Sequence, residues 1–368
     1  MNFGVPKEID PYEFRVGLVP PAVDALVRAG HNVYIETSAG LHAGFHDGDF
    51  EKVGGKIVYS ASEAYRRADL VIKISPPRET EYMNIRPETA IIAYLMLPVA
   101  PGELLNTFEE NEITAIGAET IQEEDGSLPI VIPASAIAGG LAPIIAGQLM
   151  QNVAGGKGIL LNGLPGTPPA DIVILGAGSL GTYAARAFSN LGAQVTILDN
   201  KITALQKIDE MFGGKIGTMI SNPYNVMKAI CFADVVVCAA AITSQRAPQL
   251  ISKSTVQMMN PRSIIMDFSI DKGGCAETSH PTTILDPTFV KEGIIHYCVP
   301  NTPTLVARTA SYGRSNALLP FLLEIGRFGL DDAIHSNSAL KAGVNMYKGK
   351  LSHSGVAAAL SKKVEVSL

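Results

Sequence analysis

One strand–loop–helix–strand stretch in the middle of the chain constrains its fold most. An apolar run at residues 172–175 leads into the glycine loop G-A-G-S-L-G at 176–181, and a segment with helical character follows from 180 to 191. A second apolar run at 194–198 ends at Asp199. A G-x-G-x-x-G pattern alone is weak support, but strand, glycine loop, helix, strand and acid in this order predict a dinucleotide-binding βαβ unit. Asp199 is expected to accept hydrogen bonds from ribose hydroxyls and to repel a 2′-phosphate, which favours NAD over NADP.

The glycines of this loop have distinct expected roles. Gly176 makes the tight turn, Gly178 lets the backbone approach a pyrophosphate, and Gly181 lets the helix pack closely on the strand. The phosphates are expected at the N-terminus of the helix that Ser179 and Leu180 begin. Backbone N–H groups and the helix dipole favour negative charge there. The alternative interpretation is a βα turn that binds no ligand.

The composition fits a two-domain α/β protein and argues against several partners. A chain of 368 residues accommodates two domains of ordinary size, and with 47% hydrophobic and 17% charged residues it can bury large cores. The net charge of -6 gives no electrostatic basis for binding nucleic acid or an anionic membrane. The four cysteines form no C-x-x-C pair, so we expect buried free thiols in a reducing compartment. Residues 127–156 carry no charge, but their prolines and glycines favour a buried helix between domains over a membrane span.

Apolar runs alternate with helical segments along most of the chain. Strands are predicted at 3–5, 33–36, 70–74, 90–95, 113–116, 233–239, 263–268 and 294–299, besides the two that flank the glycine loop. This alternation predicts an α/β fold of two Rossmann-like, doubly wound domains, with parallel sheets and helical crossovers. Beyond Thr309 the pattern turns helical, and Pro320 is expected to mark a first turn or a kink. This C-terminal segment can return to the first domain, which would make that domain discontinuous.

Several short stretches resemble the alanine dehydrogenases, which are related to the α-subunit of proton-translocating nicotinamide nucleotide transhydrogenase. The matching stretches, besides the glycine loop, are G-V-P-K-E at 4–8, R-V at 15–16, E-T-S-A-G-L at 36–41, G-G-K-G-I-L-L at 155–161, D-K-G-G at 271–274, H-Y at 296–297 and N-T-P at 301–303. The resemblance implies a subunit with a cleft between a substrate domain, residues 1–130 plus 308–368, and an NAD-binding domain, residues 131–307. It also implies a homo-oligomer, either a hexamer or a dimer.

The resemblance assigns roles to individual residues. Arg15 matches the arginine that binds the substrate carboxylate, with a surface arginine as the alternative. Asp271 matches an aspartate beside the nicotinamide and the substrate, and Asn301 a residue near both; ordinary turn residues are the alternative for each. Ser135 matches a cofactor contact, and the alternative is that it is a helix N-cap. Glu119 matches an acid at the edge of the cleft, and the alternative is a solvated surface acid.

Two departures from the family pattern bear on the chemistry. The resemblance places a lysine that holds the substrate carboxylate and oxo group where this chain has Ser75. It places a histidine, the general acid/base, where the Y-L-M-L run that begins at Tyr94 has Met96. Methionine transfers no proton, so alanine dehydrogenase activity by the family mechanism is not expected. Lys73 lies about 7 Å along the strand from position 75, so it substitutes only after a local rearrangement. Ser75, Tyr94 and Met96 are expected to line a roomier and less charged substrate pocket.

We therefore expect an NAD-dependent oxidoreductase that acts on an amino, imino or 2-oxo acid larger or more apolar than pyruvate, with Asp271 as the acid/base. The alternatives are a redox-neutral enzyme that retains NAD, such as a cyclodeaminase or a lyase, and a non-catalytic NAD-binding regulator. No signal peptide is recognised at the N-terminus, so a cytoplasmic protein is expected. No metal is expected, because His42 and His46 lie in a glycine-containing loop without a further ligand in view.

Overall fold

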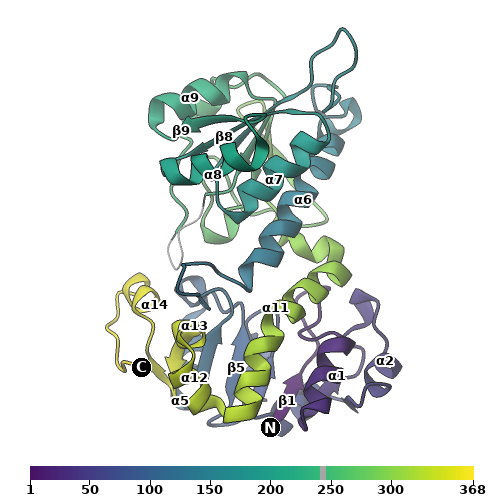
Figure 1. Ribbon diagram of the computed structural model, residues 1–368, viewed down its shortest axis with the longest axis vertical. Helices are drawn as coiled ribbons and strands as arrows, with labels where there is room; N and C mark the ends of the chain where they lie inside the picture. The colour runs from purple at the N-terminus through teal and green to yellow at the C-terminus, as the bar shows by residue number, and fades with distance from the viewer. Residues whose placement is uncertain (241–245) are drawn as a thin grey trace. The chain divides into compact units, whose positions relative to one another are not determined.

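The computed structural model describes residues 1–240 and 246–368, which form two compact units (Figure 1). Unit 1 comprises Met1–Ala134 and Pro303–Leu368, and unit 2 comprises Ser135–Thr302. The C-terminal segment therefore packs with the N-terminal one. Each unit is built around a mostly parallel sheet, which confirms the predicted α/β class with two Rossmann-like sheets.

Unit 1 surrounds a sheet whose strand order reverses next to its first strand. The strands are β1 (Asn2–Val5), β2 (Asn32–Glu36), β3 (Lys56–Val58), β4 (Leu70–Ile72), β5 (Ala90–Ala93), β6 (Thr114–Gly117), β14 (Val344–Tyr347) and β15 (Lys350–Leu351). The helices are α1 (Pro20–Arg28), η1 (Leu41–Ala43), α2 (Asp47–Glu51), α3 (Ala61–Arg67), α4 (Glu79–Tyr82), η2 (Leu97–Val99), α5 (Gly102–Glu110), α11 (Ala307–Phe328), α12 (Leu330–Ser336), α13 (Ser338–Gly343) and α14 (Ser354–Ala359), and η5 (Thr302–Val306) begins at the last residue of unit 2. The order β15-β14-β6-β5-β4-β1-β2-β3 reverses between β1 and β4, the place where doubly wound sheets bind ligands beyond their carboxyl ends.

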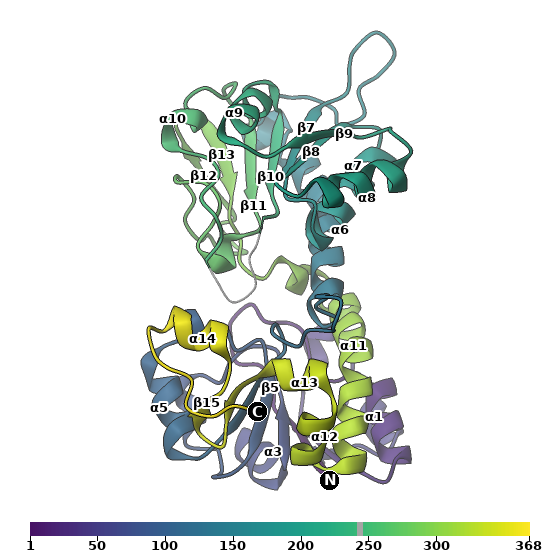
Figure 2. The ribbon, with the colours of Figure 1, turned by 60° about the vertical axis from the view of Figure 1, so that its left-hand side comes forward.

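The central strands of unit 1 are apolar on both faces because both faces are covered. In β5, Ala90 and Ile92 join one hydrophobic core, and Ile91 and Ala93 join the other. Alternate side chains of a strand point to opposite faces, so a continuous apolar run indicates a fully buried strand. On the first of these faces α11 lies alongside α1 (Figure 2).

Two features of the C-terminal segment differ from the expectation of helices alone. β14 pairs antiparallel with β6 and forms a hairpin with β15. Lys348 and Gly349 make its two-residue turn with φ values of 49° and 78°, as a type I′ hairpin requires. Pro320 lies in the middle of α11, so the first-turn alternative is wrong.

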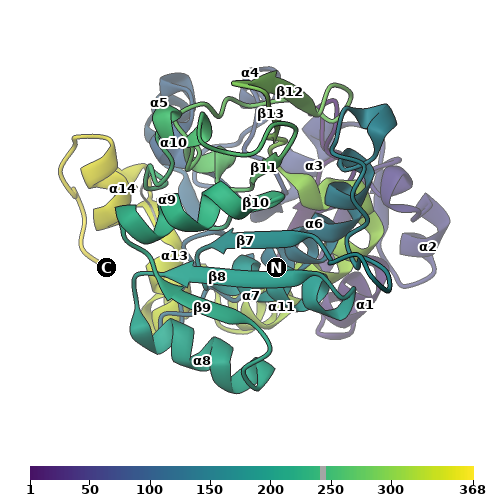
Figure 3. The ribbon, with the colours of Figure 1, turned by 90° about the horizontal axis from the view of Figure 1, so that it is seen from above.

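Unit 2 repeats the same strand order. Its strands are β7 (Asp171–Leu175), β8 (Gln194–Asp199), β9 (Gly217–Ile220), β10 (Val235–Cys238), β11 (Ile264–Asp267), β12 (Thr288–Lys291) and β13 (Ile294–Tyr297). Its helices are α7 (Ser179–Asn190), α8 (Ile202–Phe212), α9 (Pro223–Phe232), α10 (Lys253–Val256), η3 (Asn152–Ala154) and η4 (Ile270–Lys272). The order is β12-β13-β11-β10-β7-β8-β9, parallel except for β12, and Figure 3 shows β10, β7, β8 and β9 side by side. Here the order reverses between β7 and β10, which again marks a ligand-binding edge.

The uncharged stretch forms the helix α6 (Val131–Leu149), which spans the boundary between the units. It is the one helix among residues 1–240 and 246–368 that is long and apolar enough to cross a membrane. Only 33% of its most apolar window is buried, so the expectation of a buried helix holds in part. A single such helix is weak support for a membrane span, because helices of soluble proteins meet the same criteria.

Candidate active site

The glycine loop of unit 2 has the geometry that a dinucleotide requires. Gly176 has a φ of +112°, and a Cβ there would lie 2.8 Å from the backbone of Ala239, so only glycine fits the turn. A Cβ at Gly181 would collide with the carbonyl oxygen of Gly176, because α7 begins directly against β7. At Gly178, by contrast, a Cβ would meet no atom of the described residues within 4 Å. The loop therefore leaves room on the side where a pyrophosphate would lie.

Asp199 and the start of α7 complete this edge. Asp199 ends β8, and its Oδ2 accepts a hydrogen bond of 2.8 Å from the backbone N–H of Ala177. Its side chain is thereby held against the glycine loop, where an adenosine ribose lies in Rossmann domains. Ser179 and Leu180 form the first turn of α7, whose N-cap, Gly178, contributes no side-chain hydrogen bond. The N–H groups of that turn suit phosphate oxygens, so the residues present fit NAD.

Ser135 does not begin a helix. It lies inside α6, four residues after the helix starts at Val131, and it is half-buried. The N-cap alternative is therefore wrong, and the role of Ser135 as a cofactor contact stays a prediction.

Asp271 and Asn301 come together although thirty residues separate them. Asp271 lies in η4, shortly after the carboxyl end of β11, and Asn301 follows β13. The backbone N–H of Asn301 donates to Oδ2 of Asp271 at 3.5 Å. Asn301 adopts a left-handed conformation with a φ of 56°, which asparagine tolerates better than most residues. The Asp271 residue is exposed to solvent, as a group that exchanges protons with a substrate must be before binding.

Arg15 is a buried, oriented guanidinium in unit 1. Its Nε and Nη2 donate to the two carboxylate oxygens of Glu13, both at 2.7 Å. The side chains are 5% and 1% exposed, so the surface-arginine alternative is wrong. Burial lowers the pKa of Arg15, but the adjacent Glu13 carboxylate outweighs that effect and raises it, which keeps the side chain charged. Sequence reasoning missed Glu13, although it stands two residues before Arg15.

Lys73 is paired with two carboxylates, which hold it away from the role that the resemblance predicts for a lysine at position 75. Its Nζ lies 2.9 Å from Glu81 and 3.1 Å from Glu8, and its side chain is 1% exposed. Burial lowers the pKa of Lys73, but the two carboxylates outweigh burial and raise it. Ser75 follows two residues later, half-buried, with its backbone N–H 3.4 Å from Oε2 of Glu8. A movement of Lys73 towards Ser75 would leave two buried carboxylates without their cation.

Met96 stands in a strained loop that Glu119 holds. Met96 has a φ of 46°, and left-handed backbone at a residue other than glycine clusters at functional sites. The carboxylate of Glu119 accepts the backbone N–H groups of Met96 at 2.7 Å and of Leu95 at 3.1 Å. Glu119 is half-buried, so it anchors the loop and is not merely a solvated acid.

Tyr94 lies near two arginines, one of which sequence reasoning missed. Its hydroxyl donates to the carbonyl of Ile130 at 2.9 Å. The guanidinium carbon of Arg15 is 5.9 Å from the ring centre, and that of Arg314, on α11, is 5.4 Å away. The expectation of a less charged pocket omitted Arg314. The sequence signal for Arg314 was its place in the buried face of α11. Buried residues recur every three or four positions along this helix, and Arg314 is a charged residue at one of these positions.

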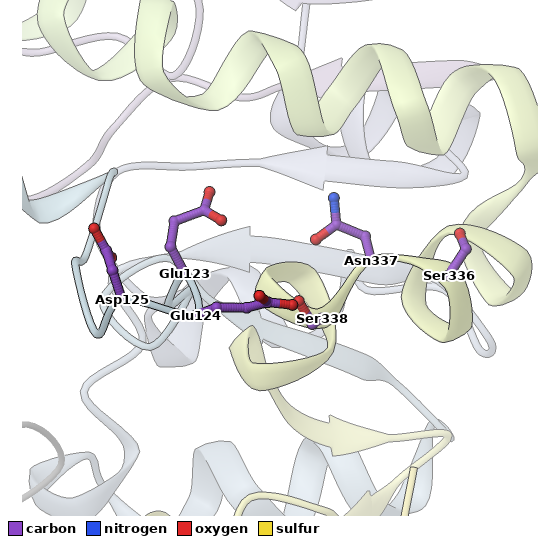
Figure 4. A pocket seen from close by; sticks show the side chains of 6 residues that line it. All are labelled: Glu123, Glu124, Asp125, Ser336, Asn337 and Ser338. Carbon is purple, nitrogen blue, oxygen red and sulfur yellow. The ribbon is translucent and has the colours of Figure 1, made fainter.

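Two hollows in unit 1 lie outside this set of residues. The larger, about 530 Å³, is lined by Glu123, Glu124, Asp125, Ser336, Asn337 and Ser338 (Figure 4). Asn337 is engaged structurally there, because it caps α13 through the N–H of Leu340 and donates to Glu324. The smaller, about 280 Å³, is lined by Phe14, His42, Thr304, Leu305, Val306, Ala307, Arg308 and Thr309. Only Phe14, the neighbour of Arg15, connects either hollow to the predicted site.

Three buried side chains of unit 2 form a possible metal-ligand group that the spacing of cysteines did not reveal. The ligand atoms of Cys238, Asp267 and Cys275 lie within 4.8 Å of one another. Asp267 already accepts backbone N–H groups from Ser269 at 3.1 Å and from Cys275 at 2.8 Å. Its carboxylate is thus used to hold the loop after β11. All four cysteines are free thiols, and burial raises the pKa of Cys298 to about 12.

The two switch-point sheets and the glycine loop define a dinucleotide-binding α/β protein. Comparison with known families refines this class: the alanine dehydrogenase/PNT N-terminal domain matches residues 4–138, and the C-terminal domain of the same family matches residues 142–354. The chain belongs to the alanine dehydrogenase/PNT family. It is an NAD-dependent enzyme of the amino acid dehydrogenase type, and its cofactor is NAD.

Individual relatives agree with this assignment. An alanine dehydrogenase of Methanococcus maripaludis is 41% identical over 360 residues, which are 98% of this chain and 96% of the relative. Alanine dehydrogenase 2 of Staphylococcus aureus is 39% identical over the full length of both chains. A solved L-alanine dehydrogenase superposes with a TM-score of 0.92 at 38% identity, covering 98% of this chain and 99% of that one. A transhydrogenase from Sinorhizobium meliloti, 22% identical with a TM-score of 0.81 and coverage of 95% and 100%, shares the fold.

Proposed function

We propose that this enzyme interconverts a 2-oxo acid and the corresponding amino or imino acid, and that its preferred pair is not pyruvate and alanine. The observation that carries the proposal is which residues follow the carboxyl ends of the strands in the unit 1 sheet, the sheet edge at which Ser75 and Met96 lie. The resemblance predicts the family's lysine and histidine at the positions of Ser75 and Met96, and Lys73, two residues before Ser75, is held by Glu8 and Glu81. A substrate with a larger or more apolar side chain suits the thioether of Met96, which adapts to varied apolar partners.

The chemistry explains why these positions matter. Conversion of a 2-oxo acid to an amino acid passes through a carbinolamine and an iminium, and protons move to and from oxygen at each stage. Histidine performs such transfers well near neutral pH, whereas methionine performs none. A substrate that arrives as an imine or a secondary amine needs fewer proton transfers. The proposal assigns the remaining acid/base role to Asp271, which Asn301 contacts through its backbone N–H.

The proposal divides the work between the two units. The NAD-binding role belongs to residues 131–307, through Gly176, Gly178, Asp199 and Ser135, and the substrate-binding role to residues 1–130 and 308–368. When bound, NAD⁺ would accept the hydride in the oxidative direction and NADH would donate it in the reductive direction. Arg15 binds the substrate carboxylate, and the bidentate contact with Glu13 fixes the orientation of its planar group. We also propose that the protein is cytoplasmic and that it forms a homo-oligomer, either a hexamer or a dimer. Light scattering on the purified protein tests the oligomeric state.

A substrate panel tests the proposed function. NADH oxidation is measured with pyruvate, 2-oxobutyrate, 2-oxoisovalerate and phenylpyruvate, each with ammonium or methylamine. We expect a larger 2-oxo acid or an amine-derived imine to give the highest kcat/KM, and Asp271→Asn to lower kcat by roughly 10²–10⁴-fold without loss of NADH binding. Pyruvate with ammonium as the best pair would refute the substrate assignment. Product formation without net NADH consumption would instead indicate the redox-neutral class, and no turnover a regulator.

A further inference from the structure

Arg314 is a buried cation of unit 1 that the function proposed above does not use. It projects from α11 and is 2% exposed. Its Nη1 donates to the carbonyl of Gly17 at 3.1 Å, and its Nη2 to the carbonyl of Lys73 at 2.5 Å. Among the described residues, no carboxylate forms an ion pair with it, and its Nε has no hydrogen-bond partner. Burial lowers the pKa of Arg314, which expresses the cost of holding this charge away from water.

The location of Arg314 links the segments that carry the predicted substrate residues. Gly17 follows Arg15 by two residues, and Lys73 precedes Ser75 by two. The ring of Tyr94 is 5.4 Å from the guanidinium carbon, within the range of a cation–π interaction. Burying a charge without a carboxylate partner has a large desolvation free energy, and two carbonyls and a ring offset only part of it. A purely apolar residue would join α11 to the sheet without this desolvation free energy, so the charge itself needs an explanation.

The sum of the buried charges in unit 1 explains why a charge is present at position 314. Besides Arg314, the buried ionisable acids and bases of the described part of unit 1 are Glu8, Glu13, Glu81, Arg15 and Lys73. When all are ionised, these five sum to one negative charge, because three carboxylates face two cations. A site of that sign in a low-dielectric interior repels a carboxylate substrate. Arg314 brings the sum to zero.

We propose that Arg314 is a positioning and specificity residue whose buried charge replaces the one absent at Ser75 and makes this edge of the sheet receptive to a single substrate carboxylate. It acts on Arg15 through the ring of Tyr94 and through the backbone of Gly17. This inference rests on the proposed function and deepens it. A neutral cluster accepts one carboxylate at moderate expense, whereas a second carboxylate would leave two uncompensated negative charges. The substrate class is therefore a 2-oxo acid with one carboxylate and a neutral side chain.

Binding of oxamate, an unreactive carboxylate analogue of a 2-oxo acid, tests the proposal. The Kd of oxamate is measured by quenching of NADH fluorescence in wild type, Arg314→Gln and Arg314→Lys. Glutamine retains an N–H donor for a carbonyl but no charge, and lysine retains the charge. We expect Arg314→Gln to weaken oxamate binding by roughly 10- to 100-fold, as loss of a charge several ångströms away implies, and Arg314→Lys to weaken it far less.

Arg327→Gln is the matched control. Arg327 is an exposed residue in the last turn of the same helix, so the variant changes net charge equally without touching the cluster. We expect its Kd for oxamate to equal that of wild type. Equal weakening by Arg314→Gln and Arg314→Lys would show that Arg314 only supports the structure, and an unchanged Kd in Arg314→Gln would also overturn the proposal.

Two further measurements keep the test decisive. If Arg314→Gln does not fold, Ser75→Lys in the intact chain adds a charge to the same edge. We expect it to tighten oxamate binding, and an unchanged affinity contradicts the proposal. The ratio of kcat/KM for 2-oxobutyrate to that for 2-oxoglutarate, which carries a second carboxylate, tests the substrate class, and a preference for 2-oxoglutarate refutes it. Oxamate binding reports recognition of a carboxylate without turnover, so these binding results can be judged separately from the outcome of the substrate panel.

Discussion

The double substitution Ser75→Lys with Met96→His introduces the lysine and histidine that the resemblance predicts for the family. It tests whether these two positions set the chemistry of this chain apart from that of its relatives. The backbone accommodates the second change well. Met96 has a φ of 46°, and histidine is several times more frequent than average in left-handed backbone. Glu119 holds the position through the backbone N–H of Met96, which the substitution leaves in place. We therefore expect the double variant to fold with little change in stability.

The size of the effect follows from two contributions. A positioned general acid/base is worth roughly 10²–10⁴-fold in rate. A cation beside developing negative charge is worth roughly 10²–10³-fold. The second gain is reduced here, because Oε2 of Glu8 lies 3.4 Å from the backbone nitrogen of Ser75 and a new lysine can pair with that carboxylate. Neighbouring substitutions are also not additive. We expect kcat/KM for pyruvate with ammonium to rise by roughly 10²–10⁴-fold, mostly from the histidine.

Steady-state NADH oxidation across pH 5.5–9 measures this outcome. In the double variant, the pH profile of kcat/KM should acquire a limb near the ordinary pKa of histidine, about 6.5, which wild type lacks. Met96→Gln with Ser75→Lys is the control, since glutamine is polar but transfers no proton. A folded, NADH-binding double variant with unchanged pyruvate activity would refute the reasoning, because the two positions would then not limit the chemistry.

Two further predictions concern unit 2. Asp199→Asn removes the charge expected to repel a 2′-phosphate, so the ratio of kcat/KM for NADPH to that for NADH should rise by roughly tenfold, and an unchanged ratio would remove Asp199 from the cofactor site. His296 is fully buried, and burial lowers its pKa below 6.5. The unfolded chain then binds the proton more readily, so the stability present above pH 6.5 is lost as pH falls below it, by up to about 1.4 kcal/mol per pH unit. Urea denaturation at pH 7.5, 6.0 and 5.0 should show a shallower loss in His296→Gln than in wild type; equal losses would exclude this histidine as the cause.

The sequence predicted those parts of the fold in which local pattern and tertiary structure agree. The apolar runs at 172–175 and 194–198 became β7 (Asp171–Leu175) and β8 (Gln194–Asp199), because Gly176 ends the first run and the polar residues from Asp199 to Lys201 end the second. The strand β14 escaped prediction for a specific reason. Asn345 interrupts its apolar pattern, yet it is fully buried and bonded to Thr120 at 2.8 Å. A partner 225 residues away in sequence leaves no local signal.

The candidate site was predictable to the same limited degree. Short motifs predicted roles for Arg15, Asp271 and Asn301, which stay predictions, and the structure brings the last two into contact. Motifs did not show that Lys73 is held by two carboxylates, since Glu8 and Glu81 approach it from other segments. Arg314 carries a local signal, a charge within the buried stripe of α11, but its partners at Gly17 and Lys73 are 297 and 241 residues away, so the sequence does not predict what it contacts.

Proton transfer and charge therefore have to be considered separately at this sheet edge. The resemblance predicts two losses, a lysine at the position of Ser75 and a histidine at the position of Met96. We propose that Arg314 on α11, 5.4 Å from the ring of Tyr94, supplies the positive charge, whereas position 96 itself carries no imidazole. Carboxylate binding and proton transfer depend on different groups, so the two should respond differently to substitution. Changes at Arg314 should act mainly on KM and on oxamate affinity, and changes at Met96 mainly on kcat and its pH profile. If substitutions at Arg314 and at Met96 altered the same kinetic constant in the same way, carboxylate binding and proton transfer would not be separate functions of this site.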